Sequence, residues 1–255
     1  SILPSATPFS RNAIFSGLFP EEFCQKYPEQ LEAMVEDKGS LNQLEHLFLK
    51  DQLARTGLVD KSLHYHKIWM VEEGQKFQSR VGEYLNMDLL AIVINFVDQL
   101  AHRRSESDVL KEMVPDESGY RHAVRVWYEN SWIRSVLAEL GSAGYKVVIT
   151  SDHGSIMVNR SSMVAADKHT SSGVRHKHGR NINAKDKSAI DIRNLDTYKL
   201  PSLGHQHNYL LAKDDYFFLY PNEQHKYKNM LKGSFQHGGI SMEEMMVPIF
   251  IMDPK

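Results

Sequence analysis

The stretch Ala-Ile-Val-Ile-Asn-Phe-Val-Asp-Gln-Leu-Ala-His, residues 91–102, decides the fold. Its first seven residues are almost continuously apolar, with Asn95 as the one interruption, which is typical of a strand buried on both faces. A second such stretch, Tyr-Lys-Val-Val-Ile-Thr at residues 145–150, follows Gly144. The amphipathic stretch 120–140 between them predicts one long helix. Strand, helix and strand in this order predict a right-handed βαβ unit, so we expect an α/β fold with a mostly parallel sheet flanked by helices.

Acidic and imidazole side chains follow both predicted strands. Asp98 ends the first strand and His102 comes four residues later, so a helix beginning there would place both side chains on one face. Asp152 and His153 follow the second strand in the same way. Because the carboxyl ends of parallel strands meet at one edge of a sheet, we expect the two pairs to converge on one crevice. The alternative for either pair alone is a turn or capping device that binds nothing.

A third imidazole lies close to the carboxyl end of the chain, in Gln-His-Gly-Gly at residues 236–239. It precedes a last predicted strand over 246–252, in which Pro248 indicates a sheet edge or a bulge. His237 thus adds a third candidate imidazole ligand, and the two glycines that follow it make the backbone there flexible. Imidazole and carboxylate ligands without thiolate favour zinc in a catalytic site over manganese or iron.

The candidate nucleophile lies in Pro-Ser-Ala-Thr-Pro-Phe-Ser-Arg-Asn, residues 4–12. Thr7 followed by Pro8 predicts a short helix over 8–17 with Thr7 as its N-cap. A helix N-terminus favours a phosphoryl group, and a metal or a base nearby would lower the pKa of the hydroxyl. The alternative is that Thr7 does no more than cap the helix.

Composition limits the remaining choices. With 255 residues, 42% of them hydrophobic, we expect a single domain over 1–255. A net charge of -2 argues against a general electrostatic grip on nucleic acid. Cys24 is the one cysteine, so no internal disulfide forms, and the longest apolar run, 89–97, is far too short to span a membrane. The sequence also predicts polar-faced helices over 21–37 and 41–56, a hairpin of 209–211 with 216–220, and a polar insertion over 159–208 that covers the active site.

Taken in order, the motifs resemble one family. They are Thr-Pro-Phe-Ser-Arg-Asn-Ala-Ile-Phe-Ser-Gly (7–17), Asn-Phe-Val-Asp-Gln-Leu-Ala-His (95–102), Thr-Ser-Asp-His-Gly (150–154) and His-Gly-Gly-Ile-Ser-Met-Glu-Glu-Met-Met-Val-Pro (237–248). This set resembles the alkaline phosphatase superfamily, specifically its PglZ branch, and within that branch the effector domain of a response regulator of type IX secretion. The resemblance covers nearly the whole chain.

The resemblance implies a phosphoesterase that uses Thr7 as nucleophile and binds two zinc ions. The implied ligands are Asp98, His102 and His237 for one ion, and Thr7, Asp152 and His153 for the other. In the family, a further Asp at the end of the first strand completes the second metal site, and this sequence has no residue that matches it. We therefore expect that the chain is a piece of a longer protein, with its first strand and a receiver domain before residue 1.

The resemblance also implies a substrate class and a setting. Domains of this kind are associated with cleaving phosphodiesters, including linear or cyclic oligonucleotides, as effectors of a two-component system. The implied partners are an upstream receiver domain and a sensor kinase, with a homodimer as a further candidate, in the cytoplasm. Two alternatives stay open: a monoesterase or sulfatase with the same fold, and a non-catalytic, metal-stapled module that binds partner proteins. The stretch 5–11 lacks the Cys/Ser-x-Pro-x-Arg spacing of a sulfatase.

Candidate substrate-binding residues are Arg175, Arg180 and Asn12. The two arginines flank a basic stretch of the polar insertion, and a planar guanidinium suits non-bridging phosphate oxygens. Asn12 lies close to Thr7 in the sequence. The alternatives are a solvated loop for the arginines and an ordinary helix-surface position for Asn12. His205 and His207 form a His-x-His pair that we interpret as loop histidines, since no carboxylate accompanies them.

Overall fold

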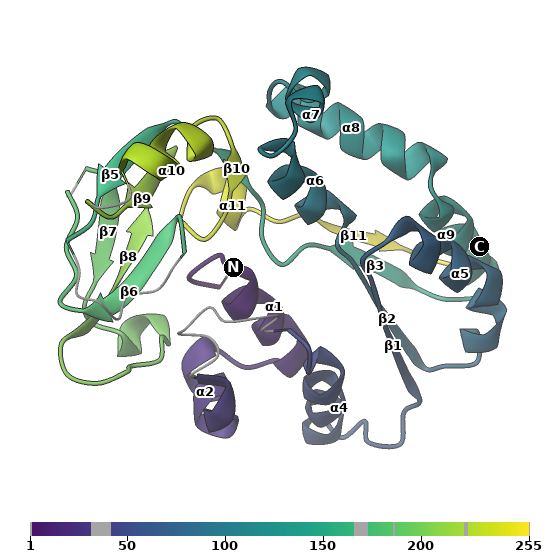
Figure 1. The fold of residues 1–255 in the computed structure, drawn as a ribbon. Coiled ribbons are helices and arrows are strands. Elements are labelled where there is room, and N and C mark those ends of the chain that lie inside the picture. Colours follow the sequence, from purple (N-terminus) through teal and green to yellow (C-terminus); the bar gives the residue numbers. More distant parts are fainter. Residues whose placement is uncertain (1, 32–41, 166–172, 186, 222–223, 255) are drawn as a thin grey trace. The chain divides into compact units, whose positions relative to one another are not determined.

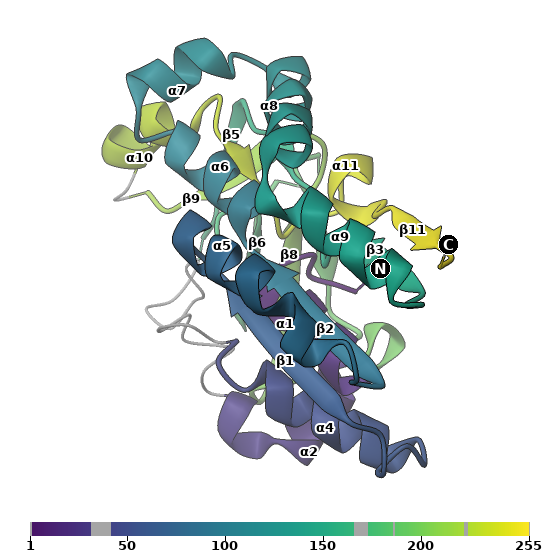
Figure 2. The same ribbon diagram turned by 90° about the vertical axis from the view of Figure 1, so that its right-hand side faces the viewer.

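The computed structural model describes residues 2–31, 42–165, 173–185, 187–221 and 224–254 (Figures 1 and 2). The chain divides into two compact units. Unit 1 comprises Ser1–Gln52 and Asp152–Val247, and unit 2 comprises Leu53–Ser151 and Pro248–Lys255. Within the described residues, no helix is both long and apolar enough to cross a membrane.

Unit 2 contains a strand within each of the stretches 91–97, 145–150 and 246–252 where the sequence predicts one, together with a strand at 63–68 that it does not predict. Its elements in chain order are β1 (Leu63–Ile68), α5 (Val71–Arg80), η1 (Val81–Tyr84), β2 (Leu89–Ile94), α6 (Phe96–Arg104), α7 (Asp108–Met113), α8 (Glu117–Asn130), α9 (Trp132–Ser142), β3 (Val147–Thr150) and β11 (Ile249–Met252). β1 and β2 are parallel and are connected through α5, as in a βαβ unit. β3 pairs antiparallel with β11. Among the residues that the structure describes, β2 and β3 do not pair with each other, so the βαβ unit predicted from 91–97 and 145–150 is not observed as one sheet, and the parallel pairing in unit 2 is that of β1 with β2.

The predicted long helix over 120–140 is wrong in one respect, because it is two helices. Ser131 separates α8 from α9 and has extended backbone angles, with φ -94° and ψ 167°. It occupies the N-cap position of α9, and serine is more favourable at an N-cap than inside a helix. α9 and α5 pack on the strands and bury Phe77, Trp132 and Val136, and Figure 2 shows α5 in front of β1 and β2. This apolar layer is the core of unit 2.

Unit 1 consists of short helices and small sheets. Its elements are α1 (Thr7–Ser16), α2 (Pro20–Lys26), α4 (Glu45–Arg55, which continues into unit 2), β4 (Ile156–Met157), β5 (Arg160–Met163), β6 (His176–Arg180), β7 (Ala189–Ile192), η2 (Asp196–Tyr198), β8 (His207–Ala212), β9 (Tyr216–Leu219), α10 (Gln224–Leu231), β10 (Phe235–Gln236) and α11 (Met242–Met245). Residues 32–41, where the predicted helices 21–37 and 41–56 meet, lie outside the described residues. The stretch 159–208, predicted as a polar and partly irregular insertion, contributes three strands to these sheets.

The predicted hairpin of 209–211 with 216–220 is wrong. Both strands exist, but β8 lies between β6 and β7 and is antiparallel to both, whereas β9 pairs in parallel with β5 (Figure 1). Because β6 and β7 already occupy both edges of β8, no edge of β8 is left for β9 to pair with. Every residue of β8 is buried, which no local pattern of a hairpin would require.

Candidate functional site

Thr7 is the first residue of α1, and Ala6 rather than Thr7 occupies the N-cap position. The expectation that Thr7 caps this helix is therefore wrong, and α1 has no side-chain cap at all. The Thr7 hydroxyl instead lies 2.9 Å from His153 Nε2, between residues separated by 146 positions in the sequence. Pro8 in the first turn fixes the backbone that presents this hydroxyl.

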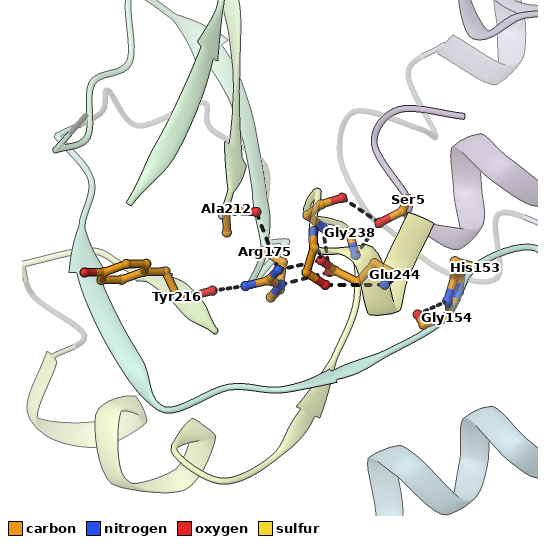
Figure 3. Close-up of polar contacts among 10 residues, drawn as sticks. Ser5, His153, Gly154, Arg175, Ala212, Tyr216, Gly238 and Glu244 are labelled. Carbon is orange, nitrogen blue, oxygen red and sulfur yellow. Dashed lines mark hydrogen bonds and ion pairs between the residues drawn. The ribbon is translucent and has the colours of Figure 1, made fainter. Parts of the chain in front are cut away.

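His153 follows the end of β3 and has a buried side chain. Its Nδ1 lies 3.0 Å from the carbonyl oxygen of Gly154, the next residue (Figure 3). A carbonyl only accepts, so Nδ1 carries the proton and Nε2 keeps its lone pair in the neutral ring. Nε2 then accepts a hydrogen bond from the Thr7 hydroxyl, and Asp152 Oδ2 lies 3.6 Å from it. One ring nitrogen thus faces both a hydroxyl and a carboxylate.

A buried arginine holds the carboxylate of Asp152. Arg11 Nε donates to Asp152 Oδ2 at 3.1 Å and lies 3.7 Å from Glu45 Oε1. Arg11 is one helical turn from Thr7, so both project from the same side of α1. The sequence placed Arg11 beside the nucleophile but gave no sign of its pairing with Glu45, a residue of α4. Contacts between residues this distant in the chain leave no local signal.

His237 lies in the loop between β10 and α11, and its ring stacks on that of His153. The ring centroids are 3.8 Å apart and the planes differ by 12°. Unit 1 therefore gathers four of the residues singled out from the sequence, which are Thr7, Asp152, His153 and His237. They come from three segments that are far apart in the chain.

Unit 2 carries Asp98 and His102, both on α6. The helix begins directly after β2, and the backbone N–H of Asn95 donates to the carbonyl of Ile68 at 3.1 Å, which ties its start to the end of β1. Asp98 Oδ1 lies 3.3 Å from His102 Nε2, which confirms that the spacing of four places both on one helix face. The hydrogen bond that the His102 ring donates to the Asp98 carboxylate raises the pKa of His102, because it favours the charged ring.

The structure corrects the predicted role of one substrate residue. Arg175 is fully buried, and its guanidinium donates to the Glu244 carboxylate (Nε to Oε1, 2.8 Å) and to the carbonyl of Tyr216 (Figure 3). A side chain with all its charge directed into the protein is not presented to a substrate phosphate. Arg180 lies at the exposed end of β6, and its substrate role stays a prediction.

Asn12 is also buried, at 1% exposure. Neither Oδ1 nor Nδ2 of its amide has a hydrogen-bond partner within the described part of the chain. An unpaired buried amide is costly, on the order of 1–3 kcal/mol. Five positions along α1 separate Asn12 from Thr7, so the two project in different directions. The substrate role of Asn12 stays a prediction.

His207 is the first residue of β8, so the interpretation of this position as a loop histidine is wrong. Its Nδ1 accepts a hydrogen bond from the backbone N–H of Leu203 at 3.1 Å. Burial lowers the pKa of His207 to about 4, so the ring is neutral at physiological pH. On β6, burial also holds the pKa of His178 well below its ordinary value.

Comparison with known proteins adds a family. A family model described as the BREX system PglZ alkaline phosphatase-like domain matches residues 1–252. Two structures of phosphonoacetate hydrolase from Sinorhizobium meliloti 1021 are similar to the chain: the complex with phosphonoformate (TM-score 0.43, 12% identity) and that with phosphonoacetate (TM-score 0.43, 13% identity). Each match covers 71% of this chain and 50% of the hydrolase, so the chain spans about half the length of that enzyme. No curated protein sequence matches.

Proposed function

The chain belongs to the PglZ alkaline phosphatase-like family, and from this membership we propose that it is a zinc-dependent phosphodiesterase with Thr7 as its nucleophile. The observation that carries the proposal is the contact of 2.9 Å between Thr7 Oγ1 and His153 Nε2. It sets a hydroxyl at the start of a helix against a nitrogen lone pair, and the carboxylate of Asp152 lies on the same side. Hydroxyl, imidazole and carboxylate in contact are the donor types of a catalytic zinc site.

The distances within this set support a metal ion there. Two ligands about 2.0–2.1 Å from a tetrahedral zinc stand roughly 3.3 Å from each other. The separations of 2.9 Å (Thr7 Oγ1 to His153 Nε2) and 3.6 Å (Asp152 Oδ2 to His153 Nε2) lie on either side of that value. The hydrogen bond from His153 Nδ1 to the Gly154 carbonyl fixes the tautomer that leaves Nε2 free to bind a metal.

We assign Thr7, Asp152 and His153 to one zinc ion and Asp98, His102 and His237 to the other. The second set draws on both units, and its assembly stays a prediction. Zinc at such sites lowers the pKa of a bound hydroxyl and balances negative charge on phosphoryl oxygens. Both effects are what a threonine side chain needs in order to attack phosphorus near neutral pH.

The chain's own residues supply orientation and charge balance. The first turn of α1 presents Thr7 at the positive end of a helix dipole, where the developing negative charge on a phosphoryl group is favoured. Attack by Thr7 Oγ1 forms an O–P bond as the bond from phosphorus to the leaving oxygen breaks, and water then hydrolyses the phosphothreonine. Arg11 holds Asp152 in place through its Nε.

We propose phosphodiesters, and among them linear or cyclic oligonucleotides, as the substrate class. The support for this is the resemblance of the ordered motifs to the C-terminal effector domain of PorX, a response regulator of type IX secretion. On this proposal a receiver domain precedes the chain and a sensor kinase acts on it in the cytoplasm. The net charge of -2 means that any grip on such a substrate is local, and Arg180 at the exposed end of β6 is the candidate.

The test of the proposal is turnover of bis(4-nitrophenyl) phosphate, with 4-nitrophenyl phosphate as the matched monoester. Two proteins are assayed: the chain alone, and the chain preceded by its native upstream sequence. We expect cleavage of the diester that a chelator abolishes and added Zn²⁺ restores. A preference for the monoester would contradict the diesterase assignment. Absence of turnover in zinc-loaded protein of both lengths would favour the alternative, a metal-stapled module that binds partner proteins.

A further inference from the structure

Unit 1 contains a fully buried ion pair, which is hydrogen-bonded to the loops that carry the candidate site. Arg175 and Glu244 have side chains with no exposed surface, and Arg175 Nε donates to Glu244 Oε1 at 2.8 Å while Nη2 donates to Oε2. The pair is therefore bidentate, which fixes the direction of both side chains. Arg175 also donates to the Tyr216 carbonyl, and Figure 3 shows the two groups facing each other. Burying two charges is costly unless each is well bonded, so the arrangement calls for a reason.

The first link runs from Glu244 to the loop that carries His237. Glu244 Oε1 accepts from the backbone N–H of Gly239 at 2.8 Å, and Oε2 accepts from the N–H of Ser241 at 2.9 Å. Gly239 fits closely, because a Cβ there would lie 2.6 Å from Arg175 Nη2. The carboxylate thus holds the loop two residues beyond His237, and the arginine leaves room there only for glycine.

The second link runs from the same turn to the loop that carries His153. The backbone carbonyl of Glu244 accepts from the N–H of Gly154 at 3.0 Å. A Cβ on Gly154 would lie 1.9 Å from the carbonyl oxygen of Glu243. Gly154 is in turn the residue whose carbonyl fixes the tautomer of His153. One helical turn, α11, therefore contacts the loops of both stacked histidines.

The third link joins the nucleophile loop to the same place. Ser5 Oγ donates a hydrogen bond to the carbonyl of Gly239 at 2.7 Å. The same oxygen accepts a hydrogen bond from the backbone N–H of Gly238 at 3.2 Å (Figure 3). Ser5 is buried and precedes Thr7 by two residues. The three segments that bring Thr7, His153 and His237 together thus meet around Glu244 and the glycines beside it.

We propose that Arg175 and Glu244 are positioning residues, which set the separation of the Thr7, His153 and His237 loops. Neither touches substrate: Glu244 acts through the backbone of Gly239 and Gly154, and Arg175 orients Glu244. The inference rests on the proposed function for its catalytic consequence, but its structural content does not depend on that function. It replaces the role in phosphate binding that the sequence suggested for Arg175.

The test compares Glu244→Gln, Arg175→Lys and Ser5→Ala with Arg160→Lys as the matched control. Arg160 pairs with Asp214 and Asp215 on the surface of the same unit, and its ion pairs within the described part of the chain do not involve the His237 loop. The readouts are amide hydrogen exchange at Gly239, zinc affinity by chelator competition, and kcat and KM for bis(4-nitrophenyl) phosphate. Exchange and zinc affinity need no turnover, so they decide the inference even if the proposed activity fails.

For Glu244→Gln we expect Gly239 to lose protection selectively, relative to the amides of β8. We also expect zinc affinity and kcat to fall by about 10–100-fold, as for partners that orient metal ligands, with KM little changed. Arg175→Lys and Ser5→Ala should follow in the same direction and Arg160→Lys should match the wild type. Equal loss of protection at Gly239 and across β8 would indicate general destabilisation and overturn the inference. Unchanged zinc affinity in all three folded variants would overturn it as well.

Discussion

Thr7 Oγ1 and His153 Nε2 lie 2.9 Å apart, although 146 residues separate them in the chain. The contact joins the first turn of α1 to the loop that follows β3, and both belong to unit 1. Because His153 Nδ1 is directed to the Gly154 carbonyl, the free lone pair of the ring points at the hydroxyl. This relationship supports a chemical role for Thr7 over a capping role.

Thr7→Val should abolish phosphodiester hydrolysis and leave the fold intact. Valine has the shape of threonine without the hydroxyl, so kcat should fall by about 10³-fold or more while the thermal midpoint changes little. Thr7→Ser, which keeps a hydroxyl, is the matched control and should retain turnover. Steady-state kinetics with protein of verified zinc content makes the comparison. Turnover by the valine variant at the rate of the wild type would remove Thr7 from the chemistry.

Arg11→Met should destabilise unit 1, and Glu45→Gln in the same chain should restore part of the loss. Arg11 lies between the carboxylates of Asp152 and Glu45, so its removal leaves two acidic groups facing each other in a buried place. Breaking a buried pair in this way costs about 3–5 kcal/mol. Urea unfolding of the two single variants and the double variant, analysed as a cycle, measures the coupling. Strict additivity of the two changes would contradict this arrangement.

Gly154→Ala should lower both stability and zinc affinity, whereas Gly141→Ala should not. The added Cβ at residue 154 would lie 1.9 Å from the Glu243 carbonyl oxygen, and backbone on both sides would have to move. At Gly141, near the end of α9, nothing lies within 4 Å of the added atom. Overpacking typically costs about 1–3 kcal/mol, whereas alanine in place of glycine in a helix stabilises by roughly 0.5–1 kcal/mol. Thermal midpoints that move the same way in both variants would contradict the prediction.

Acid should destabilise unit 1 before carboxylates titrate, because burial lowers the pKa of His207 to about 4. The unfolded chain binds a proton near pH 6.5 and the folded chain does not, so stability falls as pH decreases from about 6.5 towards 4. His178, whose pKa burial also lowers, adds to the effect. His207→Gln should flatten the decline of the thermal midpoint over this range. His122→Gln, at an exposed position on α8, is the control, and an equal flattening there would argue against the assignment.

Cys24 should resist alkylation in the folded protein at pH 8 and react once it unfolds. Burial raises the pKa of its thiol to about 12, so the reactive thiolate is scarce, and the side chain is packed among apolar residues. Because the folded state keeps the proton that the unfolded state loses near pH 9, this group also lowers stability as pH rises above about 9. Labelling with iodoacetamide across a urea series, followed by mass spectrometry, measures exposure. Rapid labelling in the absence of urea would contradict the buried position.

The sequence by itself determined the elements with strong local patterns. The β-branched runs gave β2 and β3, the spacing of Asp98 and His102 gave one face of α6, and Pro8 gave the start of α1. The order of the motifs also carried the family, since residue types at fixed spacings are a property of the chain and need no coordinates.

Tertiary structure alone decided how strands pair and where charged groups end up. A hairpin of β8 and β9 was the natural local reading, yet β8 is enclosed by β6 and β7, because ladder bonds go to whichever edge packing presents. The basic stretch around Arg175 reads as surface, but the arginine is buried because Glu244, 69 residues away, neutralises it there. Partners this far apart are chosen by the packing of the whole unit, and the free energy that favours them has no counterpart in any short window of sequence.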